Sequence, residues 1–101
     1  MSNSEPVALI TGAASGIGQA LAVAYARNGV HVVGGYFPGD PHNPEHTRQQ
    51  VAAAGGECLM LPADVTDGAS LDALAAAGVE RFGRLDYAVA NAGLLRRAPL
   101  L

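Results

Sequence analysis

The residues of this chain best suited to chemistry form the segment TGAASGIG, from Thr11 to Gly18. It holds three glycines in the spacing G-x-x-x-G-x-G, and its other residues are mostly small. An apolar run precedes it and apolar residues at helical spacing follow it, so it is predicted to join a buried strand to a helix. A helix N-terminus combines uncovered amide groups with the positive end of the helix dipole, and together these bind anions. The segment therefore predicts a site for a pyrophosphate bridge.

Each glycine of this turn has a separate predicted role. Gly12 lets the chain turn sharply without a Cβ clash, Gly16 opens the helix, and Gly18 lets the helix lie close to the strand. The spacing differs from G-x-G-x-x-G, and the GK[ST] ending of a P-loop is missing. A glycine-rich turn in some other α/β protein remains an alternative, because a glycine pattern alone has low specificity.

Composition limits the classes of protein to which the chain belongs. Its 101 residues suffice for one small domain, half of them are hydrophobic, and the formal net charge is −3. We expect no nucleic-acid partner, no membrane partner and no signal peptide, because basic clusters and long apolar runs are absent. Cys58 is the only cysteine, which predicts a buried apolar role for its side chain and a cytoplasmic protein.

Hydrophobic periodicity and turn residues predict that strands and helices alternate along the chain. The expected strands are Val7–Thr11, His31–Tyr36, Cys58–Pro62 and Leu85–Asn91. The first expected helix is Gly16–Asn28, with its apolar stripe at Ile17, Leu21, Ala24 and Tyr25. This alternation predicts an α/β fold, a doubly wound parallel sheet with helices on both faces.

Two further helices are predicted from their capping residues. One begins with Asn43 as N-cap and Pro44 as its first residue, and it ends at Gly55-Gly56. The other starts after Thr66 or Asp67. Its apolar side is expected to carry Leu71, Leu74, Gly78 and Phe82.

Three motifs fall at the edge of the predicted sheet where the strands end. They are TGAASGIG after the first strand, ADV (Ala63–Val65) after the third, and ANAG (Ala90–Gly93) after the fourth. Ligands of open α/β sheets bind outside the carboxyl ends of the strands. With VERFGRLD leading into the fourth strand, these motifs resemble the short-chain dehydrogenase/reductase family, and the resemblance covers Val7 to Gly93. It implies a Rossmann-like fold with the strand order 3-2-1-4 and a dinucleotide cofactor.

The resemblance also implies roles for individual residues. Gly12, Gly16 and Gly18 match the family's dinucleotide turn, and Ser15 and Ile17 line it. Asp64 matches the acid that receives the adenine amino group, and Val65 packs on the adenine. In the NAG element, Asn91 ties neighbouring strands together, and Ala92 and Gly93 lie along the cofactor ribose. The candidate cofactor-binding residues are thus Thr11, Gly12, Ser15, Gly16, Ile17, Gly18, Tyr36, Asp64, Val65, Asn91, Ala92 and Gly93.

Two of these positions keep alternatives. Asp64 is also suited to cap the third helix, since Asp and Thr favour helix starts. Tyr36 stands where the family chooses between NAD and NADP, and an acid there would bind the ribose hydroxyls and repel a 2′-phosphate. Tyrosine does neither, which favours NADP. Ser15 and Phe37, however, stand where phosphate-binding members often have a basic residue, and Asp40 lies within possible reach of the ribose, so the choice stays open.

The family's catalytic residues have no counterpart in this sequence. The resemblance implies hydride transfer between the nicotinamide and a carbonyl or alcohol, with a serine, a Y-x-x-x-K pair and an asparagine that all follow the NAG element. The chain contains no lysine, and its tyrosines are Tyr25, Tyr36 and Tyr87. We therefore expect residues 1–101 to form a partial NAD(P)-binding domain that is truncated after the fourth strand, lacks the catalytic half and is inactive alone. The full-length protein is expected to be a homo-oligomer.

The sequence is also compatible with two other functions. The alternatives are a non-catalytic nucleotide- or partner-binding module and a methyltransferase-like domain, the latter disfavoured by the glycine spacing, by NAG and by Tyr36. His42 and His46 have the i,i+4 spacing of a metal pair but are expected to be solvated, so no metal site is predicted. His31 begins a strand with no evident partner, and Arg96 and Arg97 are expected on a solvated loop.

Overall fold

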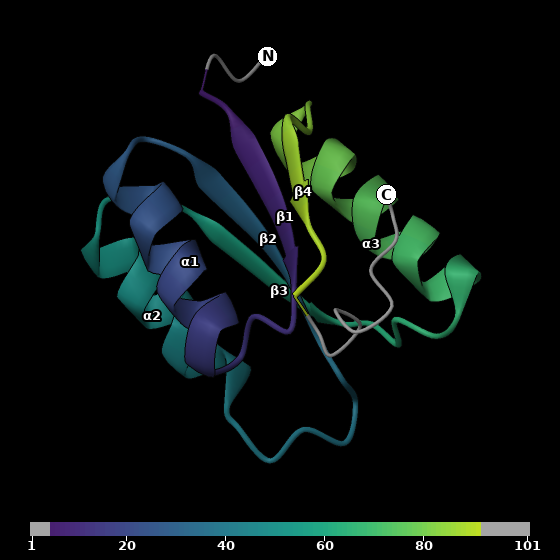
Figure 1. Cartoon of the computed structure of the whole chain (residues 1–101). Coiled ribbons are helices and arrows are strands. Elements are labelled where there is room, and N and C mark those ends of the chain that lie inside the picture. Colours follow the sequence, from purple (N-terminus) through teal and green to yellow (C-terminus); the bar gives the residue numbers. More distant parts are fainter. Residues whose placement is uncertain (1–4, 92–101) are drawn as a thin grey trace.

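The structure is a computed structural model that describes residues 5–91 (Figure 1). Strands and helices alternate along the chain, as the sequence predicts. Ala92, Gly93, Arg96 and Arg97 lie outside the described residues. The element order is β1 (Val7–Thr11), α1 (Gly16–Arg27), β2 (His31–Tyr36), α2 (Pro44–Ala53), β3 (Cys58–Pro62), α3 (Gly68–Phe82) and β4 (Tyr87–Val89). No helix within residues 5–91 combines the length and the apolar character needed to cross a bilayer.

The four strands form one parallel sheet in the order β3-β2-β1-β4, which confirms the expected arrangement. β1 pairs with β2 from Val7↔His31 to Thr11↔Gly35, and with β4 from Ala8↔Tyr87 to Ile10↔Val89. Because the strands are parallel, the loops that follow them gather at one edge of the sheet (Figure 1). We call this the carboxyl edge, and the opposite edge, where the strands begin, the amino edge.

Helices cover both faces of the sheet, and each face has its own apolar core. α1 and α2 lie together on one face, and α3 lies on the other (Figure 1). The first core includes Ile10, Val32 and Val51, with Cys58 buried among them as expected. The second core joins Val7 and Val33 to the α3 residues Leu74 and Phe82.

The capping residues of α2 and α3 behave as the sequence predicts. Asn43 accepts a hydrogen bond from the Glu45 N–H, and Pro44 is the first residue of α2. Asp67 accepts one from the Ala69 N–H at the start of α3. Three residues of the predicted side of α3, Leu74, Gly78 and Phe82, are buried, and the fourth, Leu71, is half-buried. A Cβ at Gly78 would lie 2.8 Å from a Val33 methyl group, so glycine allows the close approach of α3 to β2.

The predicted apolar stripe of α1 is wrong in phase. Its buried residues are Gly18, Ala22 and Ala26, whereas Ile17 is 71% exposed. Leu21 and Tyr25 are only partly buried against the core. The helix approaches the sheet through its smallest residues, so close backbone packing rather than side-chain bulk decides which face is covered.

The fourth strand is shorter than the predicted Leu85–Asn91. It spans Tyr87–Val89, and these residues pair with Ala8, Leu9 and Ile10 of β1. Beyond that ladder, the Asn91 N–H donates to the Thr11 hydroxyl oxygen (3.0 Å) instead of to a strand carbonyl. The residue that ends the predicted strand therefore belongs to the carboxyl edge.

Candidate functional site

The glycine turn between β1 and α1 has the conformation that its glycines predict. Gly12 (φ 66°) and Gly16 (φ 57°) are left-handed, a region that L side chains adopt only with strain. A Cβ at Gly16 would meet no atom within 4 Å, so this glycine is required by the backbone conformation and the space beside it is open. The turn thus leaves room at the start of α1.

Gly18 brings α1 against the end of β1. A Cβ at Gly18 would lie 1.9 Å from the Gly12 carbonyl oxygen and 2.8 Å from Asn91 Nδ2. The Asn91 side-chain amide donates to the same Gly12 carbonyl (3.3 Å), while its backbone N–H donates to Thr11. Residues from the ends of β1 and β4 and from the start of α1 therefore meet at one point.

The start of α1 keeps hydrogen-bond donors available. Among residues 5–91, none accepts a hydrogen bond from the N–H groups of Gly16, Ile17 or Gly18, and the Ser15 hydroxyl makes no cap bond. Uncovered amides at the positive end of a helix dipole are suited to a phosphate group. The exposed Ile17 side chain lies beside them and offers an apolar surface.

Ala13, which follows β1 in the turn, is hydrogen-bonded to two neighbouring elements. The Ala13 N–H donates to the Gly35 carbonyl at the end of β2 (3.0 Å). The Ala13 carbonyl accepts a hydrogen bond from the Thr47 hydroxyl of α2 (2.8 Å). Sequence reasoning missed Thr47, because a threonine inside a helix carries no signal of a contact 34 residues away.

Asp64, after β3, makes a local turn rather than a helix cap. Its Oδ1 accepts hydrogen bonds from the N–H (2.9 Å) and the hydroxyl (2.6 Å) of Thr66, and its own N–H donates to the Ser70 hydroxyl oxygen (2.9 Å). The hydrogen bonds from the Thr66 side chain and backbone lower the pKa of Asp64. The alternative that Asp64 caps α3 is wrong, because Asp67 does so. Val65 beside it is half-buried.

Tyr36 ends β2 at the same edge, half-buried, with its carbonyl accepting from the Ala63 N–H (2.8 Å). The nearest acid that follows it is Asp40, whose Oδ1 accepts from the backbone N–H of His42 (2.8 Å) and lies 2.7 Å from His42 Nδ1. These contacts lower the pKa of Asp40, the backbone hydrogen bond having the largest effect. Asp40 is thereby engaged within its own loop.

No group of three His, Cys, Asp or Glu side chains within the described part of the chain has the arrangement of a metal site. His46, the other member of the i,i+4 pair, lies 3.2 Å from the Gln50 side-chain amide (Nε2 to Nε2).

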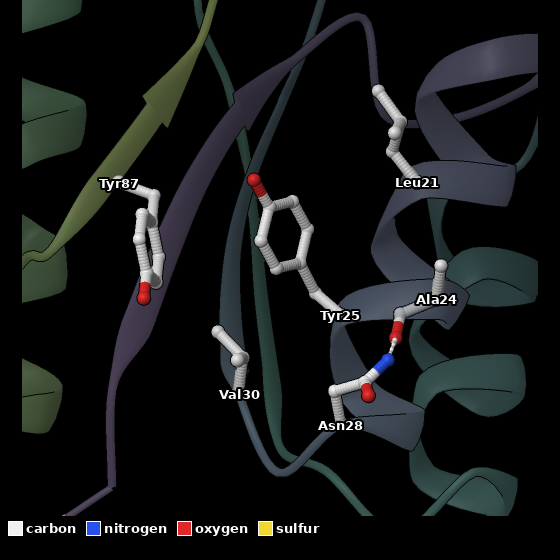
Figure 2. Close-up of a pocket in the computed structure, with 6 residues that line it drawn as sticks. All are labelled: Leu21, Ala24, Tyr25, Asn28, Val30 and Tyr87. Atoms are coloured by element: carbon white, nitrogen blue, oxygen red, sulfur yellow. Dashed lines mark hydrogen bonds between the residues drawn. The ribbon is translucent and has the colours of Figure 1, made fainter.

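A pocket of about 310 Å³ lies between α1 and the amino edge of the sheet, where β2 and β4 begin (Figure 2). Leu21, Ala24, Tyr25 and Asn28 of the α1 region line it together with Val30 and Tyr87. The Tyr25 and Tyr87 rings stack with centroids 5.7 Å apart, and the Asn28 amide donates to the Ala24 carbonyl (2.8 Å). The pocket is mainly apolar and has no set of convergent donors, so we place the candidate site at the carboxyl edge.

Comparison with known proteins identifies the family and supports the fold. The sequence profile described as short chain dehydrogenase matches residues 6–101. The chain belongs to the short-chain dehydrogenase family. The predicted resemblance is thus confirmed, and so is the parallel, Rossmann-like fold.

Individual short-chain dehydrogenases resemble the chain over most of its length. It is 41% identical over 91 residues to 2-dehydro-3-deoxy-D-gluconate 5-dehydrogenase of Dickeya dadantii, which covers 90% of this chain and 34% of that enzyme. The crystal structure of carveol dehydrogenase from Mycobacterium avium in complex with NAD superimposes with a TM-score of 0.81 at 32% identity, covering 92% and 38% of the two chains. A short chain dehydrogenase from Mycobacterium paratuberculosis bound to NAD gives 0.78 at 36% identity, covering 87% and 36%. The chain therefore spans little more than a third of these relatives.

Proposed function

We propose that this chain is the dinucleotide-binding part of an NAD(P)-dependent oxidoreductase that acts on a carbonyl or alcohol. The observation that carries the proposal is the meeting of Gly12, Gly18 and Asn91 at the carboxyl edge, beside amides that no described residue covers. Membership of the short-chain dehydrogenase family supports it. When bound, the nicotinamide ring supplies the hydride acceptor or donor.

Each residue of the site has a distinct proposed task. The amides at Gly16 and Ile17 hold the pyrophosphate, and the Ile17 side chain excludes water beside it. Asp64 uses Oδ1 for Thr66, and within residues 5–91 no donor contacts its Oδ2, so this oxygen is proposed to accept the adenine amino group. Asn91 holds the turn closed through the Gly12 carbonyl. Val65 is proposed to pack on the adenine.

Ala92 and Gly93 are proposed to lie along the cofactor ribose, on the basis of the family motif alone. We further propose that residues 1–101 are one partial dinucleotide-binding domain and that the catalytic serine, tyrosine and lysine belong to a segment outside this sequence. The chain on its own is then expected to bind cofactor without turnover.

The proposal is tested by calorimetric titration of the full chain with NAD⁺, NADP⁺ and S-adenosylmethionine. We expect saturable one-site binding of a nicotinamide dinucleotide and none of S-adenosylmethionine. Tighter binding of S-adenosylmethionine would replace the proposal with the methyltransferase alternative. If the chain shows a cooperative thermal transition, and so is folded, but binds none of the three compounds, the proposal fails. The alternative of a partner-binding module would then be favoured.

We propose that the site takes NADP at least as well as NAD, because Tyr36 carries no carboxylate to repel a 2′-phosphate. Asp40 Oδ1 is engaged by His42, which supports leaving Asp40 out of the proposed ribose contacts. Tyr36→Asp is expected to shift the ratio of the two dissociation constants at least about tenfold toward NAD, as a gained repulsion of about 1.4 kcal/mol would do. Tyr36→Phe, the control, is expected to keep the ratio, and an equal ratio in all three proteins would contradict this assignment.

A further inference from the structure

We propose that Thr47 is a positioning residue of the glycine turn and that it acts together with Gln19. The inference rests on the proposed function, since it concerns how the chain prepares the pyrophosphate site. Thr47 lies in α2 and is fully buried, whereas the turn belongs to the β1–α1 connection. Its side chain thus joins two parts of the molecule that are far apart in the sequence.

The hydroxyl of Thr47 acts as both donor and acceptor in this contact. It donates its proton to the Ala13 carbonyl (2.8 Å) and accepts a hydrogen bond from Gln19 Nε2 (2.8 Å). Gln19 Nε2 also donates to the Ala14 carbonyl (3.3 Å). Two successive carbonyl groups of the turn are therefore held by side chains from α1 and α2.

The choice of residue at position 47 is informative. A threonine inside a helix usually returns its proton to a carbonyl one turn earlier, and threonine is a weaker helix former than alanine or leucine. Here the proton crosses to another segment instead. Valine has nearly the same shape and is the usual choice for a buried apolar position, so the hydroxyl has a purpose beyond packing.

Holding a carbonyl also orients the next amide, because the two belong to one rigid peptide plane. The contact to the Ala13 carbonyl therefore fixes the direction of the Ala14 N–H, and the contact to the Ala14 carbonyl fixes that of the Ser15 N–H. Gly12 and Gly16, on either side, are the residues with the greatest backbone freedom. Thr47 and Gln19 thus hold the segment between these two glycines before any cofactor arrives. The Gln19 backbone N–H donates to the next carbonyl, that of Ser15 (3.3 Å), whose peptide plane carries the Gly16 amide proposed to hold the pyrophosphate.

The test compares Thr47→Val with two controls in the full chain, by calorimetric titration with NAD⁺ and NADP⁺ and by thermal denaturation. Thr47→Ser keeps the hydroxyl, and Val51→Ala removes buried methyl groups from the same helix without touching the turn. We expect Thr47→Val to raise both dissociation constants about tenfold, as the loss of a buried hydrogen bond would. The ratio of the two constants stays unchanged, because the turn serves the pyrophosphate that both cofactors share.

The controls separate positioning from stability. Thr47→Ser is expected to bind within about twofold of the unaltered chain, and Val51→Ala is expected to lower Tm with little effect on binding, since it keeps every hydrogen bond of the turn. If Thr47→Val lowers Tm but binds both cofactors as tightly as the unaltered chain, the residue is only structural and the inference is overturned. If the unaltered, folded chain binds neither cofactor, the proposed function fails and the inference fails with it.

Gln19→Leu gives a second test that does not depend on a buried position. It is expected to weaken binding less than Thr47→Val, because the Thr47 hydroxyl still reaches the Ala13 carbonyl. The double variant is expected to lose less than the product of the two single losses, since both changes break the same hydrogen bond. If the loss of affinity in the double variant equals the product of the two single losses, Thr47 and Gln19 act independently and the proposed coupling between them is wrong.

Discussion

Two aspartates at opposite edges of the sheet show how differently similar residues are used. At the amino edge, Asp86 accepts at both oxygens, from the Arg84 guanidinium (2.9 Å to each) and from the Val7 N–H (2.9 Å). At the carboxyl edge, Asp64 accepts only at Oδ1 from donors within residues 5–91, namely the N–H and hydroxyl of Thr66. Within this part of the chain both oxygens of Asp86 are therefore used, whereas Oδ2 of Asp64 is the oxygen that we propose for a ligand.

The same contrast holds for the remaining polar groups of the two edges. At the amino edge, His31 Nδ1 accepts from the Glu57 N–H (3.0 Å), its Nε2 lies 2.6 Å from Glu5, and its ring stacks on Phe82 (centroids 5.3 Å apart). The expectation that His31 lacks a partner is wrong for this reason. At the carboxyl edge, the amides that open α1 find no acceptor within residues 5–91. We therefore base the proposed site on polar groups that have no partner within residues 5–91, not on residue type alone.

The largest expected effect is that of Gly18→Ala at the carboxyl edge. The added Cβ would overlap the Gly12 carbonyl oxygen at 1.9 Å, so the turn must move. Such overpacking costs about 1–3 kcal/mol of stability, and we expect cofactor binding to be lost to calorimetry. Gly68→Ala at the start of α3 is the matched control, since its Cβ would meet nothing within 4 Å. Unchanged binding in Gly18→Ala would show that the cofactor site lies elsewhere.

Phe82→Ala, at the amino edge, is expected to reduce stability without reducing cofactor affinity. Phe82 is 6% exposed, stacks on His31 and belongs to the second core. Its truncation is expected to lower the free energy of unfolding by about 3–5 kcal/mol. Denaturant unfolding measures this loss, and titration below the transition is expected to give the cofactor affinity of the unaltered chain. A loss of affinity in the folded variant would break the proposed division between the edges.

Substitution of each aspartate is expected to change a different property, with smaller effects than those above. Asp64→Asn is expected to weaken NAD⁺ and NADP⁺ binding about tenfold, because an amide is a poorer acceptor than a carboxylate, and to change Tm little. Asp86→Asn is expected to lower Tm, through the weakened contacts of Val7 and Arg84, and to leave both affinities unchanged. Equal losses of affinity in the two variants would remove the distinction between them.

The smallest effect concerns pH. Hydrogen bonds lower the pKa of Asp64 through Thr66, and the Arg84 side chain, followed by the Val7 N–H, lowers that of Asp86. Both carboxylates thus stabilise the fold above their unfolded pKa, and this contribution is lost as pH falls through the folded pKa. Thr66→Val is expected to raise the pKa of Asp64 alone, as carboxyl chemical shifts would record. Bound NAD⁺ is expected to lower the pKa of Asp64 further and leave Asp86 unchanged; a shift at Asp86 alone would contradict the assignment.

Much of the fold was predictable because its signals are local. The bounds of β1, β2 and β3, the caps Asn43 and Asp67, and the apolar side of α3 follow from residues close in sequence. The errors arose where packing between elements decides. The phase of α1 depends on how closely Gly18 packs on Gly12 at the end of β1, and the length of β4 depends on its pairing with β1, about 80 residues earlier.

The residues of the candidate site likewise include some that the sequence predicts and some that it does not. The glycine turn and Asn91 were predictable from their motifs, and the structure brings them together. Thr47 and Gln19 were not, because their contacts cross between α1 and α2 and depend on how the two helices pack. The partners of His31 were missed for the same reason, since they come from residues 26 positions away on either side.

The most direct test of the central claim is to follow the backbone amide resonances of the isotopically labelled chain by NMR during titration with NAD⁺. We predict the largest chemical-shift changes at Gly12–Gly18, Asp64 and Asn91, with little change at Tyr25, His31 and Tyr87. Changes concentrated around the Tyr25–Tyr87 pocket, with a silent glycine turn, would contradict the account and move the nucleotide site to the amino edge.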